Sequence, residues 1–474
     1  MEGRLGLPSA PARPRTSQRR SMNRPVPLDE TFAPDELGDR PPAFSDDALA
    51  LHFAQVHRDD LRFVAKWGQW LSWTGMYWQL DDTLRAYDLS RAICRQVAAG
   101  CNDPKLASAL ASAKTVAAVE RLAKSDRRLA ATVDQWDGDP WLLNTPEGVV
   151  ELKTGRLRPH RPDDYMTKIT VVGPGGDCPR FLAFLERVTG GDVELQAYIG
   201  RALGYALTGE TREHALFFAY GTGANGKSVL LSTLSGILDG YHRSAPIETF
   251  TASNGDRHPT DLAGLRGARL VTATETEEGR RWAESRIKQL TGGDSVSARF
   301  MRQDFFDYRP AFKLIIAGNH KPSLRSVDEA MRRRFHMIPF AVTIPPSERD
   351  PELTEKLKAE WPGILAWLIE GTLEWQTQGL RPPQAVLDAT EAYLAAEDAT
   401  AAWIDDKCLR DLRSWEKSSD LFASWQSWAE TAGEAAGTQR RLSQTLESRG
   451  FKSQPMRHGR GFMGLRLLDK KPGF

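Results

Sequence analysis

Short apolar runs alternate with amphipathic helical patterns through the middle of the chain. The runs at residues 216–220, 269–275 and 312–319 are each bounded by turn residues, a pattern typical of buried strands. Apolar residues spaced as on one face of a helix occupy 229–237, directly after the first run. Because strands that alternate with helices form parallel sheets covered by helices, the pattern predicts an α/β fold with a parallel sheet.

The patterns on either side of this region predict further domains. Helical spacing with clustered tryptophans comes first, and short strands followed by amphipathic helices lead up to the first apolar run. Near the C-terminus, apolar and aromatic helices precede a stretch rich in glycine and arginine. The predicted segments are a disordered basic tail (1–42), a small mixed N-terminal domain (43–135), an adjacent domain of strands and helices (136–210), the α/β core (211–345), a helical lid or linker (346–410) and a winged-helix-like domain (411–474).

Composition and charge narrow the function classes. The formal net charge of +1 gives no overall attraction to nucleic acid, so a DNA-binding surface has to be a local basic stripe. The four cysteines form no C-x-x-C pair, which argues against a zinc ribbon or a disulfide framework and favours a reducing cytoplasm. No apolar run approaches the roughly 20 residues that span a bilayer, so no membrane role is expected. The N-terminal tail is interpreted as solvated, or as preceding a true start at Met22.

A glycine-rich loop follows the first apolar run. It matches G-x-x-x-x-G-K-[ST] at every position, between a predicted strand and a predicted helix. In this setting backbone N–H groups curl around phosphates, and the helix N-terminus adds positive potential. We therefore expect ATP binding, with Lys227 at the β- and γ-phosphates and Ser228 at Mg²⁺. The predicted nucleotide-binding residues are Gly221, Thr222, Gly223, Ala224, Asn225, Gly226, Lys227 and Ser228.

Polar residues end the two later apolar runs. Glu275 ends the run at 269–275, where a carboxylate would hold Mg²⁺ through water and polarise the attacking water, which makes it the candidate base. Glu277 and Glu278 could share this role, or all three could form a solvated acidic turn. Asn319 ends the next run and is the candidate sensor of the γ-phosphate, although an Asn-His-Lys-Pro turn is the plain alternative.

Three consecutive arginines, Arg332 to Arg334, precede the apolar segment 337–340. An arginine supplied across a subunit boundary neutralises charge on the transferred phosphoryl group and typically contributes roughly 10³ to 10⁵ in rate. Such a role requires a ring of subunits. The alternative is an ordinary basic helix end.

Together these motifs resemble the superfamily 3 helicases, specifically the poxvirus-type branch found in phage and plasmid primase-helicase proteins. The resemblance covers about 141–340, including 142–155, which looks like that family's helicase-adjacent domain. It implies an AAA+-like P-loop ATPase core. By motif position it places Lys227 and Ser228 in Walker A, Glu275 in Walker B, Asn319 in motif C, and Arg334, or failing that Arg333, as the arginine finger.

The stretch 287–299 looks like the motif with which this superfamily leads into a pore-facing β-hairpin. Arg299 and Arg302 offer phosphate contacts there, and Lys288 lies just upstream; these three are the predicted DNA-binding residues. The neighbouring Phe300, Phe305 and Phe306 could pack or stack beside these contacts, although strand core is the favoured interpretation of each ring. At the C-terminus, Arg440, Arg441, Lys452, Arg457 and Arg460 would give the winged-helix-like domain a basic face for DNA, and a protein-docking module is an equal alternative.

The resemblance implies an ATP-dependent DNA helicase of a phage, plasmid or prophage replication system in a bacterial cytoplasm. The ring would be a hexamer that moves 3′ to 5′ on single-stranded DNA and unwinds duplex, with ATP and Mg²⁺ as cofactors and a separate primase or replication protein as a candidate partner. Thr274 stands before Glu275 where many members have a second acid, and no primase region is evident before Trp141. The alternatives are a packaging motor, a small-molecule kinase, or an origin-binding clamp that uses ATP only to assemble.

Overall fold

The computed structural model describes residues 41–468 apart from 253–259, 276–278, 303, 325–326, 435 and 457–458. These residues divide into two compact units, one formed by 41–72 with 80–133 and the other by 73–79 with 134–468. Within the described ranges, no helix combines the length and the apolar character that crossing a bilayer requires.

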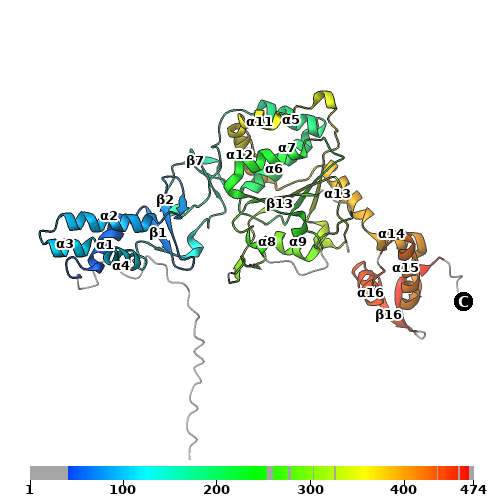
Figure 1. Ribbon diagram of the computed structural model, residues 1–474. Helices are drawn as coiled ribbons and strands as arrows, with labels where there is room; N and C mark the ends of the chain where they lie inside the picture. The colour runs from blue at the N-terminus through cyan, green and yellow to red at the C-terminus, as the bar shows by residue number, and fades with distance from the viewer. Residues whose placement is uncertain are drawn as a thin grey trace, which may run out of the picture. The chain divides into compact units, whose positions relative to one another are not determined.

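The first unit packs helices around a small sheet (Figure 1). Side chains of Ser45, Asp103 and Ser112 accept hydrogen bonds at the N-termini of three of its helices, so polar caps set where those helices begin. The apolar faces of the helices bury Phe53, Ile93 and other residues against the sheet. Its elements are α1 (Asp46–Val56), β1 (Leu61–Val64), β2 (Gln69–Trp73), α2 (Arg85–Ala99), α3 (Pro104–Leu110), α4 (Ala113–Ala123) and β4 (Ala130–Ala131), while β3 (Trp78–Leu80) lies at the boundary of the units.

A five-stranded sheet in the order β14-β8-β13-β10-β9 is the centre of the second unit. Every neighbouring pair in it is parallel, so all the strands end at one common edge, the carboxyl edge. The α/β fold with a parallel sheet, expected from the alternation of apolar runs and helical patterns, is therefore confirmed. The strands are β8 (Leu216–Tyr220), β9 (His242–Ser244), β10 (Leu270–Glu275), β13 (Lys313–Gly318) and β14 (Phe335–Pro339).

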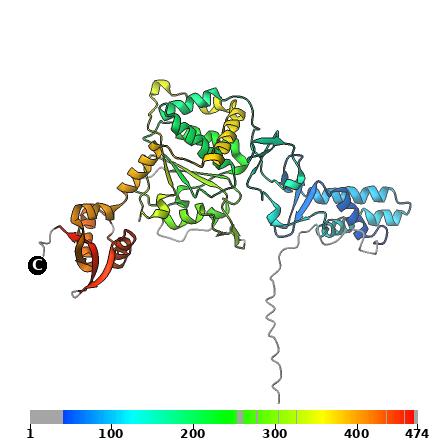
Figure 2. The ribbon, with the colours of Figure 1, turned by 180° about the vertical axis from the view of Figure 1, so that it is seen from behind.

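Both faces of this sheet are buried. Phe217 and Ile315 face one apolar core, and Phe218 and Ile316 face another, because successive side chains of a strand point to opposite faces. Helices cover the two sides, as Figures 1 and 2 show. Those of the first core are α5 (Pro179–Thr189), α6 (Val193–Leu207), α7 (Lys227–Leu238), α11 (Leu353–Lys358) and α12 (Trp361–Gln378); those of the second include α8 (Thr260–Ala263), α9 (Glu284–Thr291), α10 (Glu329–Arg332) and α13 (Gln384–Ala396).

Two smaller sheets and a hairpin complete the second unit. The antiparallel sheet β5 (Leu142–Thr145), β6 (Gly148–Glu151) and β7 (Arg156–Arg158) precedes α5, and β11 (Val296–Ala298) forms a hairpin with β12 (Phe306–Tyr308). The C-terminal segment has its own apolar core and a sheet in the order β15-β17-β16. Its elements are α14 (Ala399–Lys407), β15 (Cys408–Lys417), α15 (Ser418–Ala432), α16 (Gln439–Ser448), β16 (Lys452–Met456) and β17 (Gly459–Leu467).

Two buried cations lie at the amino edge of the central sheet. Arg269, just before β10, donates to the backbone carbonyls of Leu207, Asp139 and Leu142, and Lys313 at the start of β13 donates to those of Thr208, Glu210 and Ala311. Burial lowers the pKa of both groups, that of Lys313 well below its ordinary value. Because Leu207 ends α6, the cations meet the negative end of that helix, which stabilises their charge.

Helices α6 and α12 touch backbone to backbone. A Cβ atom added at Gly204 would lie 2.2 Å from the Thr372 nitrogen and 2.4 Å from the Gly371 carbonyl carbon. The Thr372 hydroxyl donates to the Gly204 carbonyl over 2.8 Å. Only glycine therefore fits at Gly204 without separating the two helices that cover the first core.

Replacing Gly204 by alanine is expected to lower the free energy of unfolding by at least about 2 kcal/mol, because the added methyl group overpacks a contact made by backbone atoms. Scanning calorimetry of the full chain would measure the change as a lower midpoint. Gly264→Ala is the matched control, since its Cβ would meet nothing closer than 3.9 Å. Equal midpoints for the two variants would contradict the prediction.

Candidate active site

The glycine loop joins the carboxyl end of β8 to the N-terminus of α7, so it lies where ligands bind in parallel α/β sheets. Two of its glycines are required by close approaches. A Cβ atom at Gly221 would lie 2.2 Å from the Phe340 carbonyl oxygen, and one at Gly226, where φ is +84°, would lie 2.5 Å from the Val188 side chain. The backbone of the loop is therefore packed against Phe340, which follows β14, and against α5.

The ammonium group of Lys227 is the centre of the site. It donates to the Gly221 carbonyl over 2.8 Å, to Asn225 Oδ1 over 2.9 Å and to Asn319 Oδ1 over 3.1 Å. The residue is only 7% exposed, and burial lowers the pKa of its side chain. All three acceptors are uncharged oxygens, so the site has a buried positive charge that these contacts solvate without neutralising.

Asn225 holds the loop in this form. Its buried amide donates to the Phe340 carbonyl over 3.0 Å while its oxygen accepts from Lys227. The backbone of Ile344 then donates to the Ala224 carbonyl over 2.8 Å. The loop is thus bound on one side to the segment that follows β14.

The strand register brings the other predicted residues to the same edge. Gly318 pairs with Tyr220 of β8 and with Glu275 of β10, so the strand ends that precede Asn319 and the glycine loop lie side by side with the backbone of Glu275. Ser228 is exposed in the first turn of α7. The side chain of Glu275 and the residues Glu277 and Glu278 lie outside the described residues.

The neighbouring arginines have different surroundings. Arg334 is 6% exposed; its Nε donates to Thr291 Oγ1 over 3.1 Å and its Nη1 to the Ala330 carbonyl over 2.7 Å. Arg333, the residue before it, is exposed. Arg334 is therefore bound within its own chain, and Arg333 is the one directed to solvent.

The β11–β12 hairpin has an apolar and basic tip. Phe305 is 59% exposed with the Arg299 guanidinium 4.6 Å from its ring centroid, and Phe300 is 40% exposed. Arg302 is exposed with φ +61°. The interpretation of these phenylalanines as strand core is wrong for Phe300 and Phe305, because they lie between two three-residue strands and are exposed.

Lys288, the third predicted DNA contact, lies on α9 and forms an ion pair with Asp328, the N-cap of α10. Its ammonium group therefore has a carboxylate partner within the chain, unlike Arg299, which stacks on a ring at the hairpin tip.

One further cation at the carboxyl edge escaped the motif analysis. Lys321 stands two residues after Asn319, and its Nζ lies 4.0 Å from the centroid of the Tyr220 ring, directly before the glycine loop. Burial lowers the pKa of its side chain. Lys321 belongs to the turn-forming sequence Asn-His-Lys-Pro. A lysine in a turn is usually only solvated, so the sequence did not indicate a functional residue here.

Two family models match the chain. The model described as D5 N terminal like matches residues 50–190, and a model described as a family of unknown function matches 219–334. The second match extends from the end of β8 to Arg334 and so includes the glycine loop, Asn319 and the hairpin.

Curated relatives are viral. The chain is 26% identical over 319 residues to "Putative helicase L207/L206" of Acanthamoeba polyphaga mimivirus, covering 62% of this chain and 33% of that protein. It is 24% identical over 320 residues to "Putative helicase 022R" of Frog virus 3 (isolate Goorha), covering 63% and 32%, and 25% identical over 335 residues to "Putative helicase 121R" of Invertebrate iridescent virus 3, covering 62% and 35%. The chain therefore spans about a third of the length of these relatives.

Among solved structures, the apo C-terminal region of NrS-1 (305–718) aligns with a TM-score of 0.52 at 10% identity, covering 89% of this chain and all of that one. A second structure of the same region, an A form, aligns with a TM-score of 0.51 over the same shares. At this identity the likeness concerns the fold alone.

Asn225→Ala is expected to lower the free energy of unfolding by about 1–3 kcal/mol, because the buried Phe340 carbonyl loses its donor and Lys227 loses an acceptor. Thermal melting with the matched control Thr222→Ala would measure this. Among the described residues, the exposed Thr222 hydroxyl has one hydrogen-bond contact, to Thr343 Oγ1 at 3.4 Å, so its loss should change the midpoint little. An Asn225→Ala midpoint equal to that of the control would contradict the structural role.

Proposed function

The chain belongs to the D5-type family of viral helicases, and from this premise we propose that it is an ATP-driven DNA helicase that acts as a ring. The observation that carries the proposal is the contact of the Lys227 ammonium with Asn319 Oδ1 over 3.1 Å. It joins the glycine loop to the end of a neighbouring strand, and so it relates a phosphate-binding loop to a polar group that can orient a nucleophile.

The site's residues would divide the work of hydrolysis. The loop N–H groups and the N-terminus of α7 would hold the phosphates, and Lys227 would exchange its uncharged acceptors for phosphate oxygens. Asn319 would then be free to orient the attacking water, and Glu275 would take its proton. Mg²⁺, held by the exposed Ser228 hydroxyl and by Glu275 through water, would neutralise charge on the phosphates. The proposal requires that the core be an AAA+-like P-loop ATPase.

Lys321 would add a second positive charge to this site. Its ammonium rests on the Tyr220 ring beside the loop and, among the described residues, has no carboxylate within ion-pair distance. The Tyr393 ring also lies near it, at 5.9 Å from its centroid, and a cation held by aromatic rings is easily drawn to an anion. We therefore assign it to the γ-phosphate.

The ring is proposed from the arginines. Because Arg334 is bound to Thr291 and Ala330 of its own chain, Arg333 is the better candidate to reach a neighbouring subunit's nucleotide. This reverses the preference for Arg334 that motif position alone implied. Arg334 would instead hold the end of α9 against α10, whose C-cap is Arg333.

Single-stranded DNA would be held by the hairpin tip. Exposed aromatic rings with a guanidinium stacked on one of them suit bases and backbone together, since stacking tolerates any sequence while arginine meets the phosphates. Arg299 and Arg302 are the proposed contacts, and Lys288 would support α10 through Asp328. The C-terminal segment, with helix α16 followed by the β16–β17 hairpin, supports a winged-helix fold that would bind duplex DNA.

The first test is strand separation and DNA-stimulated ATP hydrolysis. We expect Lys227→Ala and Arg333→Ala each to lose at least ~10³-fold in hydrolysis, and an equimolar mixture to regain part of it, because an intact Lys227 then meets a neighbour's Arg333. Arg349→Ala serves as the exposed-arginine control. The ring-helicase proposal would be overturned if DNA did not stimulate ATP hydrolysis and the Arg333→Ala variant were as active as the control.

Lys321→Met is expected to weaken ATP binding about 10-fold while ADP binding changes less than about 3-fold, because only ATP carries the phosphate it contacts. Titration with each nucleotide measures both affinities. Lys358→Met, which removes an exposed lysine paired with Glu355 at 2.8 Å on α11, is the matched control. Equal losses for ATP and ADP would contradict the assignment.

A further inference from the structure

The C-terminal segment contains a hollow of about 490 Å³ that we call the basic hollow. It lies where the N-termini of α15 and α16 meet the start of β17. Its lining residues are Lys417, Ser418, Ser419, Gln439, Arg440, Ser443 and Arg460.

The lining of the basic hollow is positive and contains no acid. Lys417, Arg440 and Arg460 are all exposed, and among the described residues none has a carboxylate within ion-pair distance. Lys417 lies beside the start of β17, since a Cβ atom at Gly459 would be 3.3 Å from its Cε. Three unneutralised cations around one hollow attract an anion, and a net charge of +1 shows that the attraction is local.

Helix N–H groups add to this potential. Helix α15 begins after Lys417, which makes no side-chain cap, so its first-turn N–H groups have no side-chain acceptor of the usual kind. Ser418 is 7% exposed and lines the hollow, and its hydroxyl has no hydrogen-bond partner among the described residues. A hydroxyl that lines the same hollow as three cations is suited to donate to an oxyanion.

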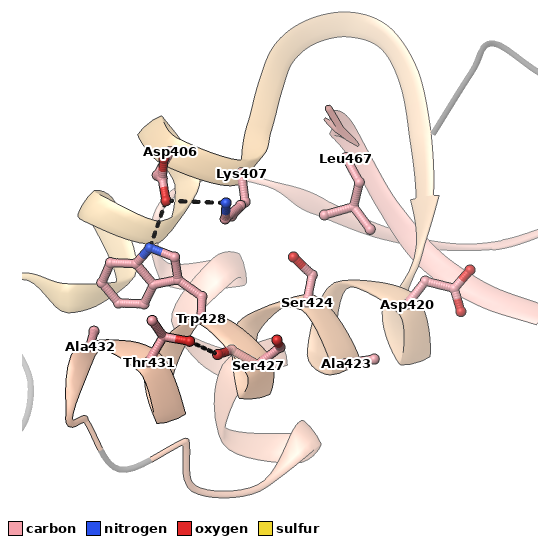
Figure 3. Close-up of a pocket in the computed structure, with 10 residues that line it drawn as sticks. All are labelled: Asp406, Lys407, Asp420, Ala423, Ser424, Ser427, Trp428, Thr431, Ala432 and Leu467. Carbon is pink, nitrogen blue, oxygen red and sulfur yellow. Dashed lines mark hydrogen bonds and ion pairs between the residues drawn. The ribbon is translucent and has the colours of Figure 1, made fainter. Parts of the chain in front are cut away.

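A second hollow in the same segment offers a contrast (Figure 3). It is lined by α14 and α15, and Asp406 there accepts from Trp428 Nε1 over 2.9 Å and pairs with Lys407 at 3.5 Å. Asp420 lies on the same lining. Its one lysine is therefore neutralised, and the hollow has no excess of positive charge to attract a polyanion.

We propose that the basic hollow binds backbone phosphates of duplex DNA and so sets the position of α16 on the duplex. Helices α15 and α16 form a helix pair joined by a short turn, and α16 presents the exposed Gln439, Arg440 and Gln444 beside the hollow. Amide and guanidinium groups on a helix are the groups that read base edges, while cations at the helix N-terminus fix its register on the backbone. This inference rests on the proposed action on DNA.

The test compares binding of a blunt duplex by the full chain and by the variant Lys417→Ala/Arg440→Ala/Arg460→Ala, as a function of salt. We expect the variant to bind at least ~10-fold more weakly and its salt slope to fall by about 2 to 3, because each lost phosphate contact removes about one unit. Lys407→Ala, in the second hollow, should match the wild type. Replacing the two arginines by lysine should retain most of the affinity, since a phosphate needs charge more than a planar group.

Hydrolysis stimulated by single-stranded DNA should remain near the wild-type level in the triple variant, because the hairpin and the nucleotide site are untouched. Duplex affinity within 2-fold of the wild type, or an equal loss in Lys407→Ala, would overturn the inference. The inference would also be overturned if inorganic phosphate stabilised the wild type but not the triple variant while the two bound duplex DNA equally. That result would indicate a site for free phosphate. Failure of the helicase proposal is distinguishable, because single-stranded DNA would then not stimulate ATP hydrolysis by the wild type.

Discussion

The buried ammonium group of Lys227 holds together the parts of the molecule on which its chemistry depends. Two oxygens from the glycine loop and one from Asn319, the residue after β13, surround it, and all three are uncharged. A buried cation with neutral partners is stable only if every donor is satisfied, so the loop, Asn225 and Asn319 have to stay together. Under the proposed function the same group would exchange a carbonyl or amide for a phosphate oxygen, so one charge would serve both the structure and the chemistry.

The sheet beneath this group depends on a balance at its two edges. At the carboxyl edge the cation meets amides, and at the amino edge Arg269 and Lys313 meet backbone carbonyls, among them those of Leu207 and Thr208 at the end of α6. Between the edges, both faces of the strands are apolar and are covered by helices. Because the middle of the sheet is buried and its ends make polar contacts, the loops at one edge can hold functional residues on a rigid scaffold.

Whether a basic side chain is neutralised depends on its surroundings in the fold, not on the number of basic residues in the chain. Arg334 and Lys288 have partners within the chain, whereas Arg333 and Arg302 are exposed and the half-buried Arg299 stacks on the Phe305 ring. The cations of the basic hollow are likewise unpaired among the described residues, while Lys407 close by is paired with Asp406. A chain with a net charge of +1 thus has several local surfaces of positive charge.

The sequence by itself determined the parallel α/β core, because apolar runs of strand length alternated with helical spacing, and it determined the loop from Gly221 to Ser228, because glycine positions and the lysine follow a fixed spacing. Partners were decided only by tertiary structure. The contact of Lys227 with Asn319 joins residues 92 positions apart through strand register, and the difference between Arg333 and Arg334 is one of burial between adjacent, chemically identical side chains. Spacing along a chain carries local geometry, but which charges are neutralised depends on what the fold brings from elsewhere.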